Sequence, residues 1–445
     1  MKGRVEAGYA DAVRVRRNRL DMRAHCGAMD RALEGRRMDL IIRNARILHD
    51  AELHFVDIGI VGSEIAAIEP GLRAEASEID AAGCLVVPGL IETHIHLDKT
   101  CILDRCRIEE GTVAEAARQT AAAKRNFTAE DVYARARRTL ERCIVNGTMR
   151  MRTHVELDPG IGMTGFDAIT QLKQDYAWAL DLEICVFPQE GLTNYPGTEE
   201  LLIEGLRRGA RTIGAAPYFD TDPRGQIDRI FAIAREFDAE IDMHLDLAET
   251  TEGMQIDYVC RKTEEYGWGG RVAVGHVTQM SLAPPERFNA IARRLADTGV
   301  AVTVLPSTDL HLMGRRHDHA VPRGVVPLEP LRKLDVTCSI STNNVQNPFT
   351  PYGDGSLIRM ANLYANVCHV ARPDDLAGCL DMITGAAAKL LRLDDYGIAV
   401  GGLADLVCID AKDPAATIAT LAQPLWGFKR GRLSFTWERP KLHAP

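Results

Sequence analysis

The sequence predicts a parallel, TIM-like (β/α)8 barrel that carries a small β-sandwich formed by both chain ends. Two observations predict this arrangement. Between residues 89 and 395, short apolar strands alternate with amphipathic helical stretches, which is the pattern of a parallel βα architecture. Outside that range, runs rich in β-forming residues appear near each end of the chain. A chain of 445 residues is long enough for one barrel of this kind with additions.

Residues 1–37 differ in composition from the rest of the chain. They hold nine Arg and one Lys against five acidic residues, a net charge of +5 that leaves −14 for the remainder. Basic runs can serve as arms that bind nucleic acid or membranes. We favour a dispensable N-terminal appendage, because a regular pattern of short strands begins at Met38.

Residues 38–88 and 396–436 are expected to pair into the sandwich. The first segment contains short β-rich runs separated by turn residues, the spacing of strands in a small sheet. The second segment contains two matching runs, at 405–410 and 426–435. The two ends of the chain therefore flank a central domain.

The central domain, residues 89–395, contains eight expected strands. Helical patterns occupy the intervals between them, among them Ala129–Val145, Gln226–Phe237, Pro285–Ala296 and Pro373–Leu380. In a (β/α)8 barrel the active site lies at the C-terminal ends of the strands. Polar residues fall at these ends, near His94 and His96, His154, Gln189, Pro217, His244, His276, Ser307 and Asn343.

The composition favours small-molecule chemistry. With 53 basic and 62 acidic residues, the formal net charge is −9, which is unfavourable for binding nucleic acid or an anionic membrane. No uninterrupted apolar run approaches the roughly 20 residues of a membrane-spanning helix. The eleven Cys form no CxxC pair and several lie in apolar segments, as expected for reduced thiols in the cytoplasm.

The strongest local signal is the pair His94 and His96 at the end of an apolar strand. Alternate residues of a strand point the same way, so both imidazoles face one point in the barrel mouth and can reach one metal ion. His244 and His276 each close another apolar strand. Four other histidines are expected to have different roles: His154 as a satisfied hydrogen bonder, and the loop residues His311, His317 and His319 as surface or lid residues.

Several separated motifs resemble the amidohydrolase superfamily, and within it the cytosine deaminase-like group that also contains hydrolases of s-triazine side chains. The resemblance extends from about Met38 to Arg432 and implies a distorted (β/α)8 barrel with a small β-sandwich from both chain ends. The motifs are His94-Ile-His96-Leu-Asp98-Lys99, Val186-Phe-Pro-Gln189-Glu-Gly, His244, His276, Leu310-His-Leu-Met-Gly-Arg315, Asn347-Pro-Phe349-Thr-Pro-Tyr-Gly and Tyr396-Gly-Ile-Ala-Val-Gly-Gly-Leu-Ala-Asp-Leu-Val.

The resemblance implies that His94, His96 and His244 bind one divalent metal ion. Zinc is our first choice, with iron or manganese as alternatives. Such an ion lowers the pKa of bound water toward neutrality and so generates hydroxide. His276 would then orient the attacking water, or hold the leaving group or oxyanion.

Two positions depart from the family pattern. Where the family has an Asp that binds metal and takes the water proton, this chain has Asn343, whose amide coordinates weakly and accepts no proton. Where cytosine deaminases have a Glu that carries a proton to the ring, this chain has Leu247; the triazine-side-chain hydrolases also lack that Glu. We name Asp98 and Asp246 as substitute catalytic acids because they lie next to ligand positions, although acids there more often act as hydrogen-bond partners of ligating His.

Four residues are expected to contact the substrate. The resemblance aligns Gln189 with a residue whose amide contacts the edge of a heterocycle, and Phe349 with an aromatic that lines the pocket. Asn343 and Asn344 replace a pair of acids found in cytosine deaminases. The pocket is therefore less negative than in a cytosine deaminase and should accept anionic substrates better. Arg315, in the loop after the seventh strand, is a candidate anion contact, although exposed loop Arg are more often merely solvated.

We therefore expect a hydrolase that cleaves a C–N bond of a small polar, nitrogen-heterocyclic compound, by deamination or amide-type cleavage. The mechanism would be metal–hydroxide attack on a trigonal carbon, and cytosine should be a poor substrate. The alternative is a catalytically silenced relative that binds a small ligand. We expect no nucleic-acid or membrane partner, a cytoplasmic location and, as is common in the family, a homo-oligomer.

Overall fold

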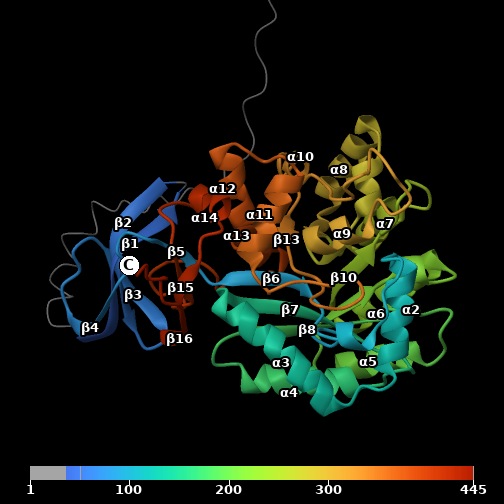
Figure 1. The fold of residues 1–445 in the computed structure, drawn as a ribbon, viewed down its shortest axis with the longest axis horizontal. Coiled ribbons are helices and arrows are strands. Elements are labelled where there is room, and N and C mark those ends of the chain that lie inside the picture. The colour runs from blue at the N-terminus through green and yellow to red at the C-terminus, as the bar shows by residue number, and fades with distance from the viewer. Residues whose placement is uncertain (1–36, 51, 444–445) are drawn as a thin grey trace, which may run out of the picture.

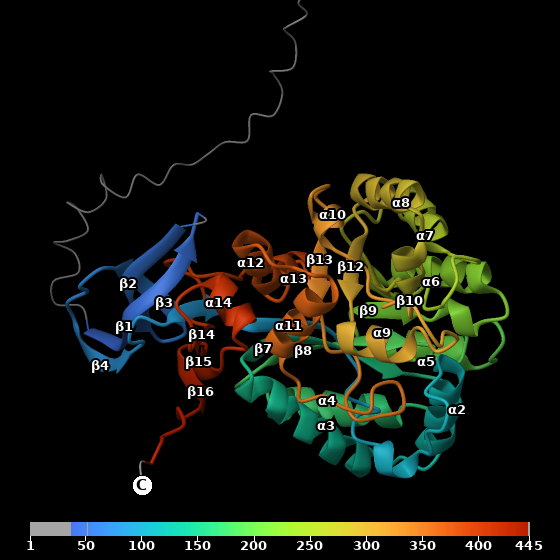
Figure 2. The ribbon, with the colours of Figure 1, turned by 45° about the horizontal axis from the view of Figure 1, so that its top comes forward.

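The computed structural model describes residues 37–50 and 52–443 (Figure 1). Apart from its last residue, the expected appendage 1–37 lies outside the described residues. Two sheets organise the fold: a parallel barrel and a mostly antiparallel sheet made of both chain ends. Figures 1 and 2 show the two sheets beside each other, with most of the helices around the barrel.

Eight parallel strands follow one another around the barrel in sequence order. They are β6 (Leu90–Ile95), β7 (Thr148–Glu156), β8 (Asp181–Phe187), β9 (Thr212–Ala215), β10 (Glu240–Leu245), β11 (Val272–His276), β12 (Ala301–Val304) and β13 (Cys338–Ile340). Asn343, just after β13, closes the circle against β6. Its N–H donates to the carbonyl of His94 and its carbonyl accepts the N–H of His96, both at 2.9 Å.

Helices cover the outside of the barrel and bury one apolar face each. In the helix that starts at Pro285, the buried face includes Ile291, Ala292 and Leu295, which follow helical spacing. The longer helices are α2 (Val113–Lys124), α3 (Ala129–Val145), α4 (Thr164–Asp175), α5 (Thr198–Arg207), α6 (Pro223–Phe237), α7 (Ile256–Tyr266), α8 (Pro285–Thr298), α11 (Leu357–Val367) and α12 (Pro373–Asp381). Shorter helices are α9 (Pro306–Leu312), α10 (Glu329–Arg332), α13 (Gly385–Leu390) and α14 (Pro414–Ala419).

The second sheet joins the two ends of the chain. Its strands are β1 (Arg37–His49), β2 (Glu52–Val61), β3 (Glu64–Glu69), β4 (Glu75–Asp80), β5 (Leu85–Pro88), β14 (Leu406–Ile409), β15 (Pro424–Lys429) and β16 (Arg432–Thr436). The ends meet where β5 pairs antiparallel with β14, with Leu85 opposite Ile409 and Pro88 opposite Leu406. Buried residues from both ends, such as Ile58 of β2 and Leu406 and Cys408 of β14, form one core in this sheet.

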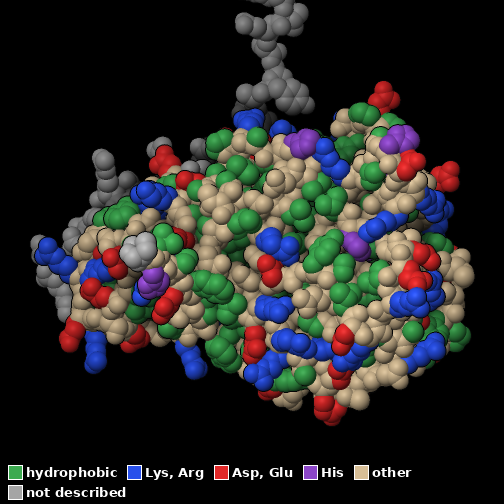
Figure 3. Space-filling view, in the orientation of Figure 1, with side chains coloured by type: hydrophobic (Ala, Val, Ile, Leu, Met, Phe, Trp, Pro, Cys, Tyr) green, Lys and Arg blue, Asp and Glu red, His purple; other side chains and the backbone are tan. Residues whose placement is uncertain are grey.

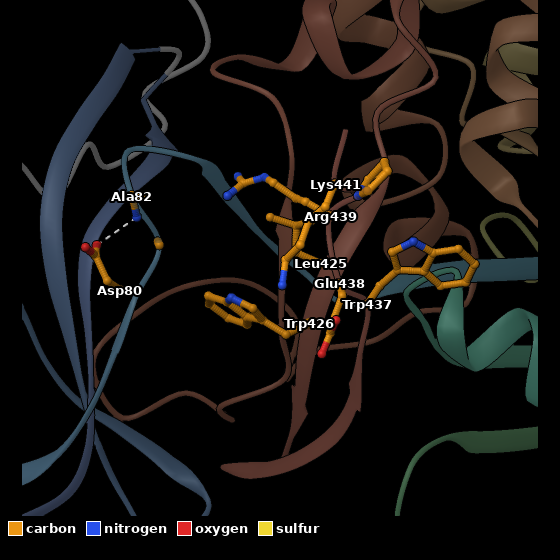
Figure 4. Close-up of a pocket in the computed structure, with 10 residues that line it drawn as sticks. Asp80, Ala82, Leu425, Trp426, Trp437, Glu438, Arg439 and Lys441 are labelled. Atoms are coloured by element: carbon orange, nitrogen blue, oxygen red, sulfur yellow. Dashed lines mark hydrogen bonds between the residues drawn. The ribbon is translucent and has the colours of Figure 1, made fainter. Parts of the chain in front are cut away.

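A cavity of about 430 Å³ lies beside the second sheet, away from the barrel mouth. Trp426, Trp437 and Arg439 line it together with neighbouring residues of the chain end (Figure 4). On the face of the molecule shown in Figure 3, basic and acidic side chains are interspersed. No described helix is long and apolar enough to cross a membrane.

The predicted fold class, a barrel with a β-sandwich from both chain ends, is confirmed. The expected helix 129–145 has the same bounds as α3, whose N-terminus is capped by the Thr128 hydroxyl accepting from the N–H of Asp131. Some strands end slightly earlier than expected. The strand β12 ends at Val304 because the chain turns there into α9.

Candidate metal centre and active site

Three imidazoles meet at the C-terminal end of the barrel. His94 lies in β6, His96 follows it directly, and His244 lies in β10. The Nε2 atom of His244 is 3.0 Å from Nε2 of His94 and 2.9 Å from Nε2 of His96. All three side chains are buried. The structure therefore brings the three predicted ligands together at one point.

These imidazoles are kept uncharged by their surroundings. Burial, reinforced by the neighbouring His154, lowers the pKa of His94 to about 3. Burial also holds the pKa of His96 and of His244 well below the usual range. Their Nδ1 atoms are buried and have no hydrogen-bond partner within the described residues. Neutral imidazoles with converging nitrogens are a donor set for divalent transition metals, so these three residues fit such an ion.

The buried carboxylate of Asp242 lies next to the imidazoles of His94 and His154. Asp242 places Oδ1 3.6 Å from Nδ1 of His94 and 3.6 Å from Nε2 of His154, while its Oδ2 accepts from Arg152 at 3.0 Å. The rings of His154 and His94 stack with centroids 3.9 Å apart. Contrary to expectation, neither ring nitrogen of His154 has a hydrogen-bond partner among residues 37–50 and 52–443. His154 is thus a further imidazole beside the centre, with a nitrogen within 4.8 Å of nitrogens of His94 and His244.

Asn343 lies directly beside the ligands. Its main chain bridges His94 and His96, and its φ of +64° lies in the left-handed region. Both amide atoms of its side chain are buried, and neither has a hydrogen-bond partner in the described part of the chain. A buried polar atom without a hydrogen-bond partner destabilises the protein, and a ligand that hydrogen-bonds or coordinates it removes that cost. The placement agrees with the predicted weak coordination, which stays a prediction.

His276 pairs with a buried carboxylate that follows the seventh barrel strand. Its Nδ1 lies 2.6 Å from Oδ1 of Asp309, a residue of α9. The other oxygen of Asp309 accepts the N–H of Leu305 at 3.0 Å. Burial raises the pKa of Asp309, and His276 opposes this rise. Because Nδ1 is engaged, Nε2 is the nitrogen of His276 left for reacting atoms, and the ring lies 5.6 Å from that of His244.

Lys99 and Gln189 form one wall of the site. The ammonium Nζ of Lys99 donates to Oε1 of Gln189 at 2.8 Å. It lies 5.3 Å from the ring centre of Phe187 and 4.9 Å from that of Phe349. Phe187 in turn stacks on His244 with ring centroids 4.7 Å apart. The predicted substrate residues Gln189 and Phe349 therefore lie on a wall that adjoins the metal centre.

A charged cluster lies behind this wall. Glu156 accepts from Lys99 at 2.6 Å and from Lys124 at 3.1 Å, and Lys124 also pairs with Asp158 and Glu190. The carboxylates of Glu156, Asp158 and Glu190 lie close enough together to hold a metal ion. Burial would raise the pKa of Glu156, but the two ammonium groups lower it to about 2. The Lys124 ammonium contacts all three carboxylates, so we interpret the cluster as an ion-pair network.

The two predicted substitute acids are held by main-chain groups. Asp246 accepts the N–H groups of Gln255 and Ile256 at 2.8 and 3.1 Å, which fixes the start of α7. Asp98 accepts the N–H of Glu156 at 2.9 Å through Oδ2, and its Oδ1 is buried with no partner among the described residues. Proton transfer by either acid stays a prediction.

The last two predicted substrate residues occupy different surroundings. Asn344 is buried, and its Oδ1 accepts from Nδ2 of Asn347 at 2.6 Å. Arg315 lies in an exposed loop, where its Nε donates to the carbonyl of His311 at 2.9 Å and its backbone N–H donates to Glu249 at 2.8 Å. A contact between Arg315 and an anionic substrate stays a prediction.

The structure adds three residues to which the sequence reasoning assigned no role. Asp242 lies two positions before His244 in one strand, so strand alternation could have placed it on the same face. Lys99 is part of the motif that contains His96, but its partner Gln189 is distant in sequence. Asp309 is 33 residues from His276, and no local spacing links the two.

Comparison with known proteins places these features in a family. The model of the amidohydrolase family matches residues 77–181 and 181–423. The chain is 27% identical over 405 residues to N-isopropylammelide isopropyl amidohydrolase from Pseudomonas sp. (strain ADP), covering 89% of this chain and 96% of the relative. It is 26% identical over 346 residues to pterin deaminase from Rhizobium rhizogenes, covering 76% and 78%.

A solved structure agrees with this assignment. The structure of 5-methylcytosine deaminase from Klebsiella pneumoniae, liganded with 5-fluorocytosine, is similar to this one with a TM-score of 0.86 and 27% sequence identity. The superposition covers 91% of this chain and 99% of the deaminase. The predicted resemblance is confirmed. The chain belongs to the amidohydrolase family.

Proposed function

We propose that this enzyme hydrolyses a C–N bond of a small polar nitrogen heterocycle, by deamination or amide-type cleavage. The observation that carries the proposal is the convergence of His94, His96 and His244 beside the paired side chains of His276 and Asp309. The names of the relatives, an N-isopropylammelide amidohydrolase, a pterin deaminase and a 5-methylcytosine deaminase, support a heterocyclic substrate.

His94, His96 and His244 are the proposed ligands of one divalent metal ion, with zinc as the first choice, and Asn343 is a weak additional ligand through its amide oxygen. When bound by imidazoles, such an ion lowers the pKa of a water molecule toward neutrality and so supplies a nucleophile. The chain contributes three neutral imidazoles in a buried, fixed arrangement, because burial keeps each ring unprotonated.

His276 is the proposed catalytic residue for proton transfer. Its Nδ1–H donates to Asp309, which sets the tautomer of the ring and directs Nε2 at the reacting atoms. In this tautomer Nε2 can take a proton from the attacking water and return it to the departing nitrogen. Asp309 acts through His276 and is a positioning residue. The pair supplies the proton acceptor that the amide of Asn343 cannot provide.

The uncharged amides of Asn343 and Asn344 favour a substrate that carries negative charge, since a ligand carboxylate meets no acid at these two positions. Cytosine is a poor substrate in this proposal. Leu247 and Asn343 stand where the family resemblance places the two proton carriers of cytosine deaminases. General acid–base help of this kind is typically worth about 10²–10⁴-fold.

Asn343 also favours a second candidate function, a ligand-binding protein without turnover. The two candidates differ in one measurable quantity, the release of ammonia or amine. The test uses full-length protein loaded with zinc, iron(II) or manganese and a panel of cytosine, isocytosine and carboxylated or oxo-substituted amino heterocycles. We expect turnover of at least one carboxylated or oxo compound, and a loss of about 100-fold or more in His276→Asn. A metal-loaded protein that binds members of the panel but releases no ammonia or amine would overturn the enzyme proposal in favour of the binder.

A cytoplasmic location and a homo-oligomeric state belong to the same proposal. The many cysteines without a CxxC pair support a reducing compartment. The proposed partner is a small molecule rather than nucleic acid or membrane, which the net charge of −9 supports.

A further inference from the structure

The amide of Gln189 has a fixed orientation. An ammonium group carries only hydrogen-bond donors, so the Nζ of Lys99, 2.8 Å away, can bond only the oxygen of this amide. The NH2 group of Gln189 therefore points away from Lys99. Gln189 is 4% exposed, and its Nε2 has no hydrogen-bond partner in the described part of the chain. A buried NH2 group without a partner gains free energy when a ligand accepts its hydrogen bond.

Lys99 is itself locked in place. Its side chain is buried, its Nζ donates to Glu156 at 2.6 Å, and it sits between the rings of Phe187 and Phe349. Rotation of the Gln189 amide by half a turn would set its NH2 group against the ammonium group. The cost of that contact keeps the carbonyl oxygen of Gln189 toward Lys99.

Hydrogen bonds also fix the side-chain amides of Asn347 and Asn344. The N–H groups of Phe349 and Thr350 donate to Oδ1 of Asn347, at 3.0 and 3.2 Å. The NH2 group of Asn347 therefore donates to Oδ1 of Asn344 at 2.6 Å and to the carbonyl of Lys99 at 3.3 Å. With its oxygen engaged, Asn344 has its NH2 group left for a ligand.

We propose that Lys99 is a specificity-determining residue: through Gln189 it selects heterocycles that present hydrogen-bond acceptors along the edge that meets this wall. Oxo groups, carboxylates and unprotonated ring nitrogens qualify. An amino group at that edge would set N–H against N–H and leave both without a partner. The inference rests on the proposed function and narrows its substrate class. The C–N bond to be cleaved must lie on another edge of the ring, toward His244 and His276.

The test compares two pyrimidines whose edges have opposite patterns. Uracil presents acceptor, donor, acceptor along its O4–N3–O2 edge, and 2,4-diaminopyrimidine presents donor, acceptor, donor. Calorimetric titration of the full-length, metal-loaded protein should show uracil binding about 10- to 100-fold more tightly. In Lys99→Met the amide of Gln189 can rotate, so the preference should fall to within about threefold. Gln189→Glu offers only acceptors and should reverse the preference.

Lys124→Met is the matched control, because Lys124 is a second buried ammonium on Glu156 and has no hydrogen bond to Gln189. It should keep the wild-type preference. If Lys99→Met does not fold, an unreversed preference in Gln189→Glu still overturns the inference. Failure of wild-type protein to bind uracil at millimolar concentration, a wild-type preference for the diamino ring, or an undiminished preference in folded Lys99→Met would each overturn the inference.

The two proposals fail separately. A preserved uracil preference with no hydrolysis of any panel compound would overturn the proposed function and leave the role of Lys99 standing. Hydrolysis of a panel compound without any preference for acceptor edges would support the proposed function and overturn the role of Lys99.

Discussion

The Nδ1 atom of His276 lies 2.6 Å from the Oδ1 atom of Asp309, and both side chains are buried. The second oxygen of Asp309 accepts the N–H of Leu305, so the carboxylate cannot rotate away from the ring. Because β11 carries His276 and α9 carries Asp309, the pair is held by two rigid elements. The imidazole is therefore fixed before any substrate arrives.

Asp309→Asn should slow catalysis without removing the metal. An amide of the same size can turn its NH2 group to Nδ1 and impose the wrong tautomer on His276. We expect kcat to fall by about 10²–10⁴-fold with little change in KM. Steady-state kinetics with the best panel substrate, together with elemental analysis, measure both quantities. Loss of metal in parallel with activity would contradict the assignment of Asp309 to His276.

Asn343→Asp should tighten metal binding by about 10-fold or more, because a carboxylate adds charge where the amide adds only a dipole. Competition with a chelator of known affinity measures the change. Asn344→Asp is the control, since its oxygen position is already engaged by Asn347. Equal effects of the two substitutions would mean that Asn343 has no special relation to the ligands.

His94→Ala and His244→Ala should each reduce bound metal to less than about a tenth of the wild-type stoichiometry, because each removes one of three converging nitrogens. Elemental analysis of the purified proteins is the measurement. His311→Ala should retain the wild-type content. Contrary to the expectation of a loop residue, His311 lies in the last turn of α9, just before the loop that holds Arg315. Full metal content in both ligand variants would place the metal elsewhere.

Asp131→Asn should destabilise the fold at neutral pH and lose this effect in acid. The hydrogen bond from Arg105, joined by Arg135, lowers the pKa of Asp131 from 3.8 to about 2, against the effect of burial. A carboxyl whose pKa is depressed by folding stabilises the folded state above its ordinary pKa, and this contribution disappears as the pH falls to about 2. Denaturant unfolding between pH 7 and pH 2 should show the wild type and variant converging. The exposed Asp104→Asn serves as control, and a difference that stays constant with pH would contradict the pKa assignment.

The barrel was predictable because its strands leave a strong pattern in the chain. Most of their residues are buried, so β11 reads as an apolar run that ends in His276, and β10 carries His244 just before its last residue. The polar residues at the strand ends mark the mouth of the barrel. The helix α3 was predictable to the residue because a Thr cap precedes an amphipathic stretch. Local sequence carries that information.

The candidate site was only partly predictable, for a physical reason. His94 and His96 share one strand, so their convergence follows from strand alternation. The orientation of Gln189 depends on Lys99, and that of His276 depends on Asp309, through contacts between different βα units. Such contacts leave no periodicity in the sequence, so the hydrogen-bond polarity of the site emerged only from the structure.

The seam of the barrel limits what can stand at position 343. Both hydrogen bonds that join Asn343 to β6 use main-chain atoms, and the residue has a φ of +64°. Glycine, asparagine and aspartate tolerate that conformation far better than branched or bulky residues. Evolution can therefore exchange an amide, a carboxylate or no side chain at the mouth of the barrel while the ring of strands stays closed. A substitution among these three residues at position 343 would change the chemistry of the site and leave the fold unchanged.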